Sequence, residues 1–308
     1  MCNVARAEDQ PNRSLGRSGE LSRGVVKSED IIARLSEDDG TVFTVHDKIV
    51  SGRLDLRHHK ISVALEIQGC EFRDAVDLRY CEFEQAVDLT GCTFHRDFNS
   101  GDEKRSHTVF HKDLICDGVV FEGTVSFNGC RVEGSASFAG ANFLDTNETA
   151  NFGWLNVEKT LECDNAIFRG PADFSSVQCA GTAVFSGARF EGEGPTNFHT
   201  ASFGKNLICQ NTVFEGPVGF QLLECAGAGV FDNAVFRSTE EVNFIQASFG
   251  SNLQCTGTTF GGAAIFDSVR CGRSGSFAGA EFSEQVSFGY ASFGDSLDCS
   301  GASFARAA

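Results

Sequence analysis

The sequence predicts an all-β fold in which the chain winds into a four-sided solenoid of very short strands. From Leu253 to Phe304 a large apolar residue recurs at alternating steps of five and six residues, and a small residue usually lies two positions before it. The residue between the two must face outward, because successive side chains of an extended segment point to opposite faces. Four steps make 22 residues, and residues 22 apart are chemically alike, as Phe260, Phe282 and Phe304 show. A repeat of this period indicates a solenoid.

The same columns continue towards the N-terminus, so we expect one elongated domain and not two compact ones. Phe and Cys dominate the large inward position after residue 115, whereas aliphatic residues such as Leu56, Ile61 and Ile67 share it in the early coils. The pattern gives about eleven to twelve coils, which at a strand spacing of ~4.8 Å make a column of roughly 55 Å. The chain has 30 Phe but two Tyr and one Trp, which is typical of a dry interior because Phe needs no hydrogen-bond partner.

Three segments are expected. Residues 1–27 are polar and without period, which indicates a flexible N-terminal arm. Residues 28–40 predict a capping helix with Ser28 as N-cap and with Ile31, Ile32 and Leu35 on one face, closing the open end of the column. Residues 41–308 form the solenoid. Its last coil has no matching cap, so we expect either that this end pairs with another chain, as in a homodimer, or that the sequence is a fragment.

The units Ala280-Glu281-Phe282, Ala291-Ser292-Phe293 and Ala188-Arg189-Phe190 resemble the pentapeptide-repeat family, whose unit is A-(D/N)-(L/F)-x-x. The resemblance covers about residues 45–304 and implies a right-handed parallel β-helix of square cross-section. The chain departs from the family pattern by alternating five- and six-residue steps and by preferring Phe to Leu, which suggests a wider coil.

A second period of two coils overlies the first. Cys116, Cys163, Cys209, Cys255 and Cys299 are 47, 46, 46 and 44 residues apart. The extra residues fall within 95–104, 144–151, 191–197 and 237–243. We expect these insertions at one and the same corner, forming a row of bumps along one edge.

Charge restricts the partners. Residues 1–60 carry ten basic and ten acidic residues, whereas residues 61–308 carry 15 and 32, so the net charge of −17 belongs to the solenoid. An acidic rod repels nucleic acid, so direct binding of DNA or RNA is not expected. Some pentapeptide-repeat proteins protect DNA gyrase by occupying its DNA-binding groove, which makes a DNA-mimic modulator the alternative function here. No apolar segment resembles a signal peptide or a membrane span.

The 13 cysteines are interpreted as compact apolar residues and not as ligands or disulfides. No C-x-x-C occurs, and equivalent sulfurs in most columns lie about two strand spacings apart, beyond bridging range. Cys70 and Cys92 are the exception, one coil apart in one column. Free thiols indicate a reducing cytoplasm. Eight cysteines take the large inward position (116, 163, 179, 209, 225, 255, 271, 299) and four take the small one (70, 81, 92, 130).

No catalytic constellation is found. The sequence lacks G-x-S-x-G, P-loop and dinucleotide-binding motifs. His95, His107 and His111 gather near the first insertion, where a metal site is the alternative to a solvated loop, and the loop is favoured. We therefore expect no enzymatic activity, no cofactor and no metal.

The outward residues suggest a contact surface for another chain. On two neighbouring sides of the square, eight of twelve outward residues between 115 and 235 are Ile or Val, against one of twelve on the other two sides. A β-propensity effect should act on all four sides equally, so the bias favours an interaction stripe. Its residues are Ile115, Val120, Ile167, Val184, Ile208, Val213, Val230 and Val235. The expected function is a protein–protein interaction scaffold whose partner is an unidentified protein or a second copy.

A polar row is expected on a third side. Asn151, Asn197 and Asn243 recur 46 residues apart, each just after an insertion. The favoured role is structural, an amide that bonds the backbone of the turn, and the alternative is a ladder that binds a ligand.

Overall fold

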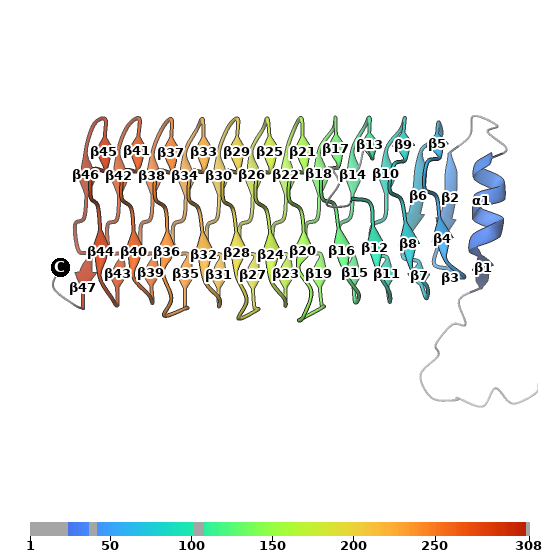
Figure 1. The fold of residues 1–308 in the computed structure, drawn as a ribbon, viewed down its shortest axis with the longest axis horizontal. Coiled ribbons are helices and arrows are strands. Elements are labelled where there is room, and N and C mark those ends of the chain that lie inside the picture. The colour runs from blue at the N-terminus through green and yellow to red at the C-terminus, as the bar shows by residue number, and fades with distance from the viewer. Residues whose placement is uncertain (1–23, 37–41, 102–107, 306–308) are drawn as a thin grey trace, which may run out of the picture.

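A computed structural model describes residues 24–36, 42–101 and 108–305 as one long column of stacked coils with a helix across its N-terminal end (Figure 1). All strands are parallel and lie in four sheets, here named A to D, which form the four walls of the column. The chain passes from sheet A to C, D and B and then returns to A one coil further along. The result is an all-β solenoid of about twelve coils with about 22 residues in each, as predicted.

Sheets A and B are neighbouring walls. Sheet A consists of β1 (Val25–Lys27), β3 (Ile49–Ser51), β7 (Glu71–Phe72), β11 (Thr93–Phe94), β15 (Val120–Phe121), β19 (Asn142–Phe143), β23 (Ile167–Phe168), β27 (Arg189–Phe190), β31 (Val213–Phe214), β35 (Val235–Phe236), β39 (Thr259–Phe260), β43 (Glu281–Phe282) and β47 (Ser303–Phe304). Sheet B consists of β2 (Phe43–His46), β6 (Leu65–Gln68), β10 (Val87–Asp88), β14 (Leu114–Ile115), β18 (Ala136–Ser137), β22 (Leu161–Glu162), β26 (Ala183–Val184), β30 (Leu207–Ile208), β34 (Gly229–Val230), β38 (Leu253–Gln254), β42 (Gly275–Ser276) and β46 (Leu297–Asp298).

Sheets C and D complete the square. Sheet C consists of β4 (Leu54–Asp55), β8 (Val76–Asp77), β12 (Phe98–Asn99), β16 (Val125–Ser126), β20 (Ala150–Asn151), β24 (Ala172–Asp173), β28 (Thr196–Asn197), β32 (Val218–Gly219), β36 (Val242–Asn243), β40 (Ala264–Ile265) and β44 (Val286–Ser287). Sheet D consists of β5 (Lys60–Ile61), β9 (Glu82–Phe83), β13 (Val109–Phe110), β17 (Arg131–Val132), β21 (Asn156–Val157), β25 (Gln178–Cys179), β29 (Ser202–Phe203), β33 (Glu224–Cys225), β37 (Ser248–Phe249), β41 (Arg270–Cys271) and β45 (Ser292–Phe293).

The interior is a continuous apolar core. Phe214, Phe236 and Phe260 occupy one column of sheet A, as predicted, with stacked rings whose centroids are 5.0 and 5.1 Å apart. Each is at most 1% exposed. Rings from neighbouring walls meet edge to face, as Phe214 and Phe220 do at 6.3 Å and 88°. Aromatic pairs in these two arrangements contribute about 0.5–1.5 kcal/mol each beyond their buried area.

The helix α1 (Ser28–Ser36) caps the first coil. Ile31 is 1% exposed, and Ile32 and Leu35 pack partly buried against the core, so the predicted apolar face is confirmed. Residues 37–40 of the predicted helix lie outside the described residues. Val25–Lys27, which we had placed in the N-terminal arm, instead form strand β1 and pair with β3.

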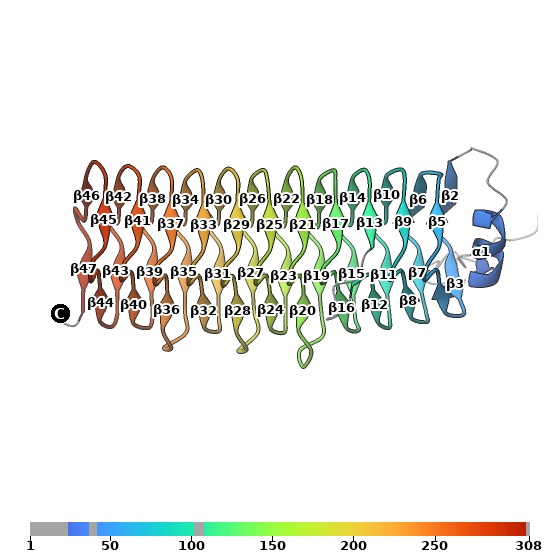
Figure 2. The ribbon, with the colours of Figure 1, turned by 45° about the horizontal axis from the view of Figure 1, so that its top comes forward.

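The insertions follow the prediction at three of four places. Loops between β19 and β20, β27 and β28, and β35 and β36 project from the edge between sheets A and C (Figure 2). The prediction for 95–104 was wrong, because β11 joins β12 by a tight turn and the extra residues lie between β12 and β13, at the next edge. Phe98 fills the small inward position of β12, and buried Ser100 takes the large one and donates a hydrogen bond to the Ser126 carbonyl.

Candidate interaction surfaces

The predicted stripe lies on sheets A and B, with every member half-buried by its neighbours. Strand register brings five of the eight together. Val184, Ile208 and Val230 are successive rungs of sheet B, and Val213 and Val235 are successive rungs of sheet A in the same coils. We call these five residues the apolar patch.

The other three stripe residues lie outside the patch. Ser137 and Glu162 separate Ile115 from Val184 along sheet B. Asn142 lies between Val120 and Ile167, and Arg189 lies between Ile167 and Val213 along sheet A. The stripe is therefore interrupted, and unbroken runs of Ile and Val begin at Val184 on sheet B and at Val213 on sheet A.

Charged residues border the apolar patch. Glu162 lies on the rung next to Val184 in sheet B, and Asp164 follows at the turn. Partial burial raises the pKa of both carboxyl groups, and the mutual repulsion of the pair raises that of Glu162 further. On sheet A, Arg189 pairs with Glu191 at 2.9 Å and Arg237 with Glu215 at 2.6 Å. The N-terminal border of the patch on sheet B is thus acidic.

The histidines near the first insertion do not form one cluster. His95 follows β11 on sheet A and lies between Glu122 (Nδ1, 2.8 Å) and Glu71 (Nε2, 3.1 Å). His111 follows β13 on the opposite sheet D and lies between Glu133 (Nδ1, 2.8 Å) and Glu82 (Nε2, 3.0 Å). His107 lies outside the described residues, which contain no group of three or more His, Cys, Asp or Glu side chains that could hold a metal ion.

The two bridges have the same electrostatics. The side-chain hydrogen bond to Glu122 raises the pKa of His95, and the bond to Glu133 raises that of His111. The hydrogen bonds to His111 in turn lower the pKa of Glu82 and Glu133. Each histidine, when protonated, therefore links carboxylates of different coils of an acidic rod.

The twelve cysteines from Cys70 to Cys299 are free, and all but Cys299 are buried. Burial raises the pKa of Cys81 to about 12 and raises that of Cys116 well above its usual value. Several thiols donate to carbonyls of the preceding coil, as Cys81 does to Leu56 at 2.6 Å. Thr212 donates to the Phe185 carbonyl at 2.7 Å from an equivalent position. Cys2 lies outside the described residues.

The asparagine row on sheet C bonds the turns, as favoured from the sequence. The Oδ1 atoms of Asn151, Asn197 and Asn243 accept hydrogen bonds from the backbone N–H two residues later, at 3.0, 2.9 and 2.9 Å. Asp173 does the same for Ser175. These Asx turns lead the chain round the edge between sheets C and D.

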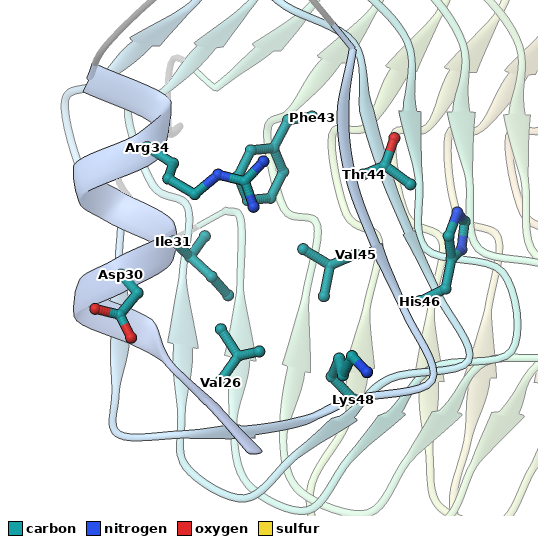
Figure 3. A pocket seen from close by; sticks show the side chains of 9 residues that line it. All are labelled: Val26, Asp30, Ile31, Arg34, Phe43, Thr44, Val45, His46 and Lys48. Atoms are coloured by element: carbon teal, nitrogen blue, oxygen red, sulfur yellow. The ribbon is translucent and has the colours of Figure 1, made fainter. Parts of the chain in front are cut away.

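Hollows in the described residues also lie outside the stripe. One of about 220 Å³ lies between α1 and β2, where Val26, Ile31, Phe43 and Val45 face a common space and the Arg34 guanidinium lies 4.9 Å from the Phe43 ring centre (Figure 3). Another, of about 390 Å³, is a shallow groove on sheet C lined by Pro195, Pro217 and Gly219 among others, between two projecting loops.

The last coil leaves core residues open to solvent. Phe282 is 2% exposed, but Leu297 and Phe304 are 43% and 48% exposed. The prediction that this end pairs with another chain stays a prediction.

The sequence analysis missed a row of side chains on the edge between sheets C and D. At this edge, wherever the turn lies in the described residues, the second residue after the inward column residue has a positive φ, between 55° and 68°. Tyr80, Trp154, Leu222 and Tyr290 occupy this position after β8, β20, β32 and β44. We call these four residues the corner row. The signal was available, because the chain's one Trp and both its Tyr residues follow an inward Leu or Phe by two positions.

No family model, curated protein or solved structure matches this chain. Among the described residues, no helix is long and apolar enough to cross a membrane.

Proposed function

We propose that this chain is a cytoplasmic protein-binding scaffold of the pentapeptide-repeat type, without enzymatic activity, and that the apolar patch on sheets A and B is its binding surface. The carrying observation is that Ile and Val occupy consecutive outward rungs on two neighbouring walls, Val184, Ile208 and Val230 on sheet B and Val213 and Val235 on sheet A. Soluble monomeric proteins rarely expose a large contiguous apolar patch unless it makes a contact.

The filled interior supports a scaffold role. Catalysis needs polar groups that converge in a concave site. Here Phe and Cys side chains occupy the column, and the outward residues of each wall lie in nearly flat ladders. A flat ladder presents many side chains to a broad partner surface, which is the geometry of protein recognition.

The border of the patch defines the chemistry of the partner. Glu162 and Asp164 are partly desolvated carboxylates beside Val184 and have raised pKa values. A cationic side chain placed against them would favour their charged forms. The partner expected here is a folded protein with an apolar centre and Lys or Arg at its rim.

The test replaces the centre of the patch. Ile208→Lys with Val213→Lys should raise the Kd of the partner at least tenfold, because two charges replace apolar contacts and 1.4 kcal/mol corresponds to a factor of ten. The control is Ser202→Lys with Ser248→Lys, which adds the same charge at outward positions of sheet D. Affinity capture from the native host, compared among the wild type and both variants, identifies proteins lost only from the patch variant. Equal capture by all three would contradict the proposal.

One observation favours the alternative of a DNA mimic. The projecting loops at the A–C edge carry Asp145 and Glu148, Glu193, and Glu240 with Glu241, at intervals of two coils. None of these carboxylates has a basic partner within 4 Å among the described residues. A gyrase supercoiling assay with added protein and an inhibitor tests this function. Relief of inhibition that Glu193→Gln, Glu240→Gln and Glu241→Gln abolish would favour it over the scaffold.

A further inference from the structure

Two opposite edges of the column use the same backbone conformation with different residues. At the edge between sheets B and A, each turn has one residue with φ between 51° and 68°. Eight of these residues are Gly, and the others are Asp47, Asn165, Asn211 and Asn233. This composition is expected, because Gly, Asn and Asp tolerate the left-handed region.

The edge between sheets C and D breaks that rule. Its positive-φ residues are His58, Tyr80, Gly129, Trp154, Ser176, Thr200, Leu222, Gln246, Ser268 and Tyr290. One of these ten is Gly. Large and β-branched residues at positive φ are strained, and such strain accumulates where the side chain has a role.

Crowding explains the difference at only some turns: an added Cβ would lie 2.6–2.8 Å from an Asp or Asn Oδ1 at Gly69, Gly187 and Gly257, but other turns are open. A Cβ added at Gly118, Gly140 or Gly279 on the B–A edge would meet no atom within 4 Å. Side chains could therefore extend into solvent on that edge too. Among the described residues, large apolar and aromatic side chains occupy these positions on the C–D edge alone, which points to a contact that this edge makes.

The corner row is evenly spaced. β8, β20, β32 and β44, which precede Tyr80, Trp154, Leu222 and Tyr290, are every third strand of sheet C. At ~4.8 Å per coil the four side chains lie about 14 Å apart. Trp154, Leu222 and Tyr290 are 47%, 43% and 97% exposed, and Tyr80 stacks on His58 with ring centres 4.9 Å apart. Smaller residues occupy the positions between them, Gly129 and Gln246 included.

This spacing fits another stack of strands. The spacing of the row equals three strand spacings. An α-helix with a pitch of ~5.4 Å would make about 2.7 turns over the same distance, so its side chains would not stay in register with the row. An evenly spaced row of four also maps onto itself when it is reversed. A twofold axis between β24 and β28 would place Tyr80 opposite Tyr290 of a second copy, and Trp154 opposite its Leu222.

The low charge of the C–D edge permits a second copy to approach it. From residue 128 to residue 289, the residues that precede the positive-φ corner positions are Asn128, Gly153, Ser175, His199, Gln221, Ile245, Asp267 and Gly289. One of these eight is acidic. On a chain of net charge −17, this edge is a place where two copies can meet with little repulsion.

We infer that the corner row is the contact through which two copies of this chain associate side by side and antiparallel. This contact is independent of the apolar patch, which lies on the diagonally opposite edge, so a dimer leaves the patch free for its partner.

Sedimentation equilibrium tests the association. The wild type should be dimeric at tens of micromolar, and Trp154→Gly with Leu222→Gly should raise the dimer dissociation constant at least tenfold. The control Asn165→Gly with Asn233→Gly makes a similar change at positive-φ positions of the opposite B–A edge and should leave the constant unchanged. Trp154 is the chain's single Trp, so its emission should shift to longer wavelength on dilution. A monomeric wild type, or equal constants for both double variants, would overturn the inference.

Disulfide trapping tests the antiparallel register in a background of Cys2→Ser and Cys299→Ser. The proposed axis places position 129 opposite position 246 of the second copy. A mixture of Gly129→Cys and Gln246→Cys proteins should cross-link on mild oxidation, and neither variant should do so alone. Cross-linking of Gln246→Cys with itself would show a parallel contact and contradict the proposed arrangement.

Discussion

At the scale of the residue, histidine joins the coils of this acidic column. His95 and His111 each lie between two glutamates on different coils, with one ring nitrogen facing each carboxylate. Only the protonated imidazole can donate from both nitrogens. A neutral ring would turn a lone pair towards one of the carboxylates, which is why the pKa of each histidine is raised.

These bridges predict a pH dependence of stability. The folded-state pKa of His95 and His111 lies above the unfolded value of about 6.5, so their contribution is fully present below that pH. It is lost as pH rises through the folded-state values. The bridges are partly exposed, so solvent screening keeps their contribution to the free energy of unfolding small.

Thermal unfolding between pH 6 and pH 9 measures this effect. The unfolding temperature of the wild type should fall across this range more than that of His95→Gln with His111→Gln. The control is His199→Gln, an exposed histidine. A double variant that follows the wild-type profile throughout would show that the bridges contribute nothing.

At the scale of the element, the turns determine which residues the edges accept. Each strand contributes two to four residues, and most contribute two, so the turns make up much of every coil. Asx bonds from sheet C hold the C–D turns, and backbone N–H groups at the B–A turns donate to the next coil, as Gly118 does to Ala139 at 2.8 Å. The positive φ is thus set by the stacking of the coils and not by the residue that adopts it.

A reciprocal pair of substitutions measures the strain in these turns. A non-Gly residue in the left-handed region costs about 1–2 kcal/mol, and introducing Gly costs roughly 0.4–1 kcal/mol through the unfolded chain. Gln246→Gly should therefore stabilise the protein by up to about 1 kcal/mol. Gly279→Gln on the other edge should destabilise it by a similar amount, since its Cβ would meet open space. Urea unfolding gives both values. A loss of stability in Gln246→Gly would mean that its side chain supports the turn.

Much of the fold could be predicted because the inward pattern depends on a few residue types. The large inward position at each short strand accepts Phe, Cys, Leu or Val and few other residues. The inward columns and the buried cysteines could therefore be predicted from the sequence. The first insertion was misplaced because β12 inverts the rule, with Phe98 at the small position and Ser100 at the large one. Phe98 fills the space that Ser100 leaves in the core. Its ring centre lies 4.8 and 5.4 Å from those of Phe94 and Phe121 of sheet A.

The candidate surfaces were less predictable. The stripe was predicted from residue types, but strand register determines which of its residues are neighbours. Ser137, Glu162 and Arg189 lie between members of the stripe. The corner row escaped notice because its meaning depends on φ. Nothing in the sequence of Phe152-Gly153-Trp154 states that Trp154 adopts the left-handed conformation, and only comparison of the two edges makes it unusual.

At the scale of the whole molecule, the column separates stability from recognition. The interior residues stack with their equivalents in neighbouring coils and contribute the cohesion of the rod. The outward rows are left to carry charge and contacts: the apolar patch on one edge, the corner row on the opposite edge and acidic loops on a third. Substitutions in these rows should change binding with little effect on folding.

Thiol titration tests the sealed column most directly. Eleven of the cysteines are buried in the described residues, and burial raises the pKa of several of them, Cys163 and Cys209 included, so the reactive thiolate is scarce. With an aromatic disulfide reagent at pH 8, the native protein should release at most the equivalents of Cys299 and Cys2 within minutes. In denaturant it should release all 13. Rapid reaction of most thiols in the native protein would contradict a filled, closed interior.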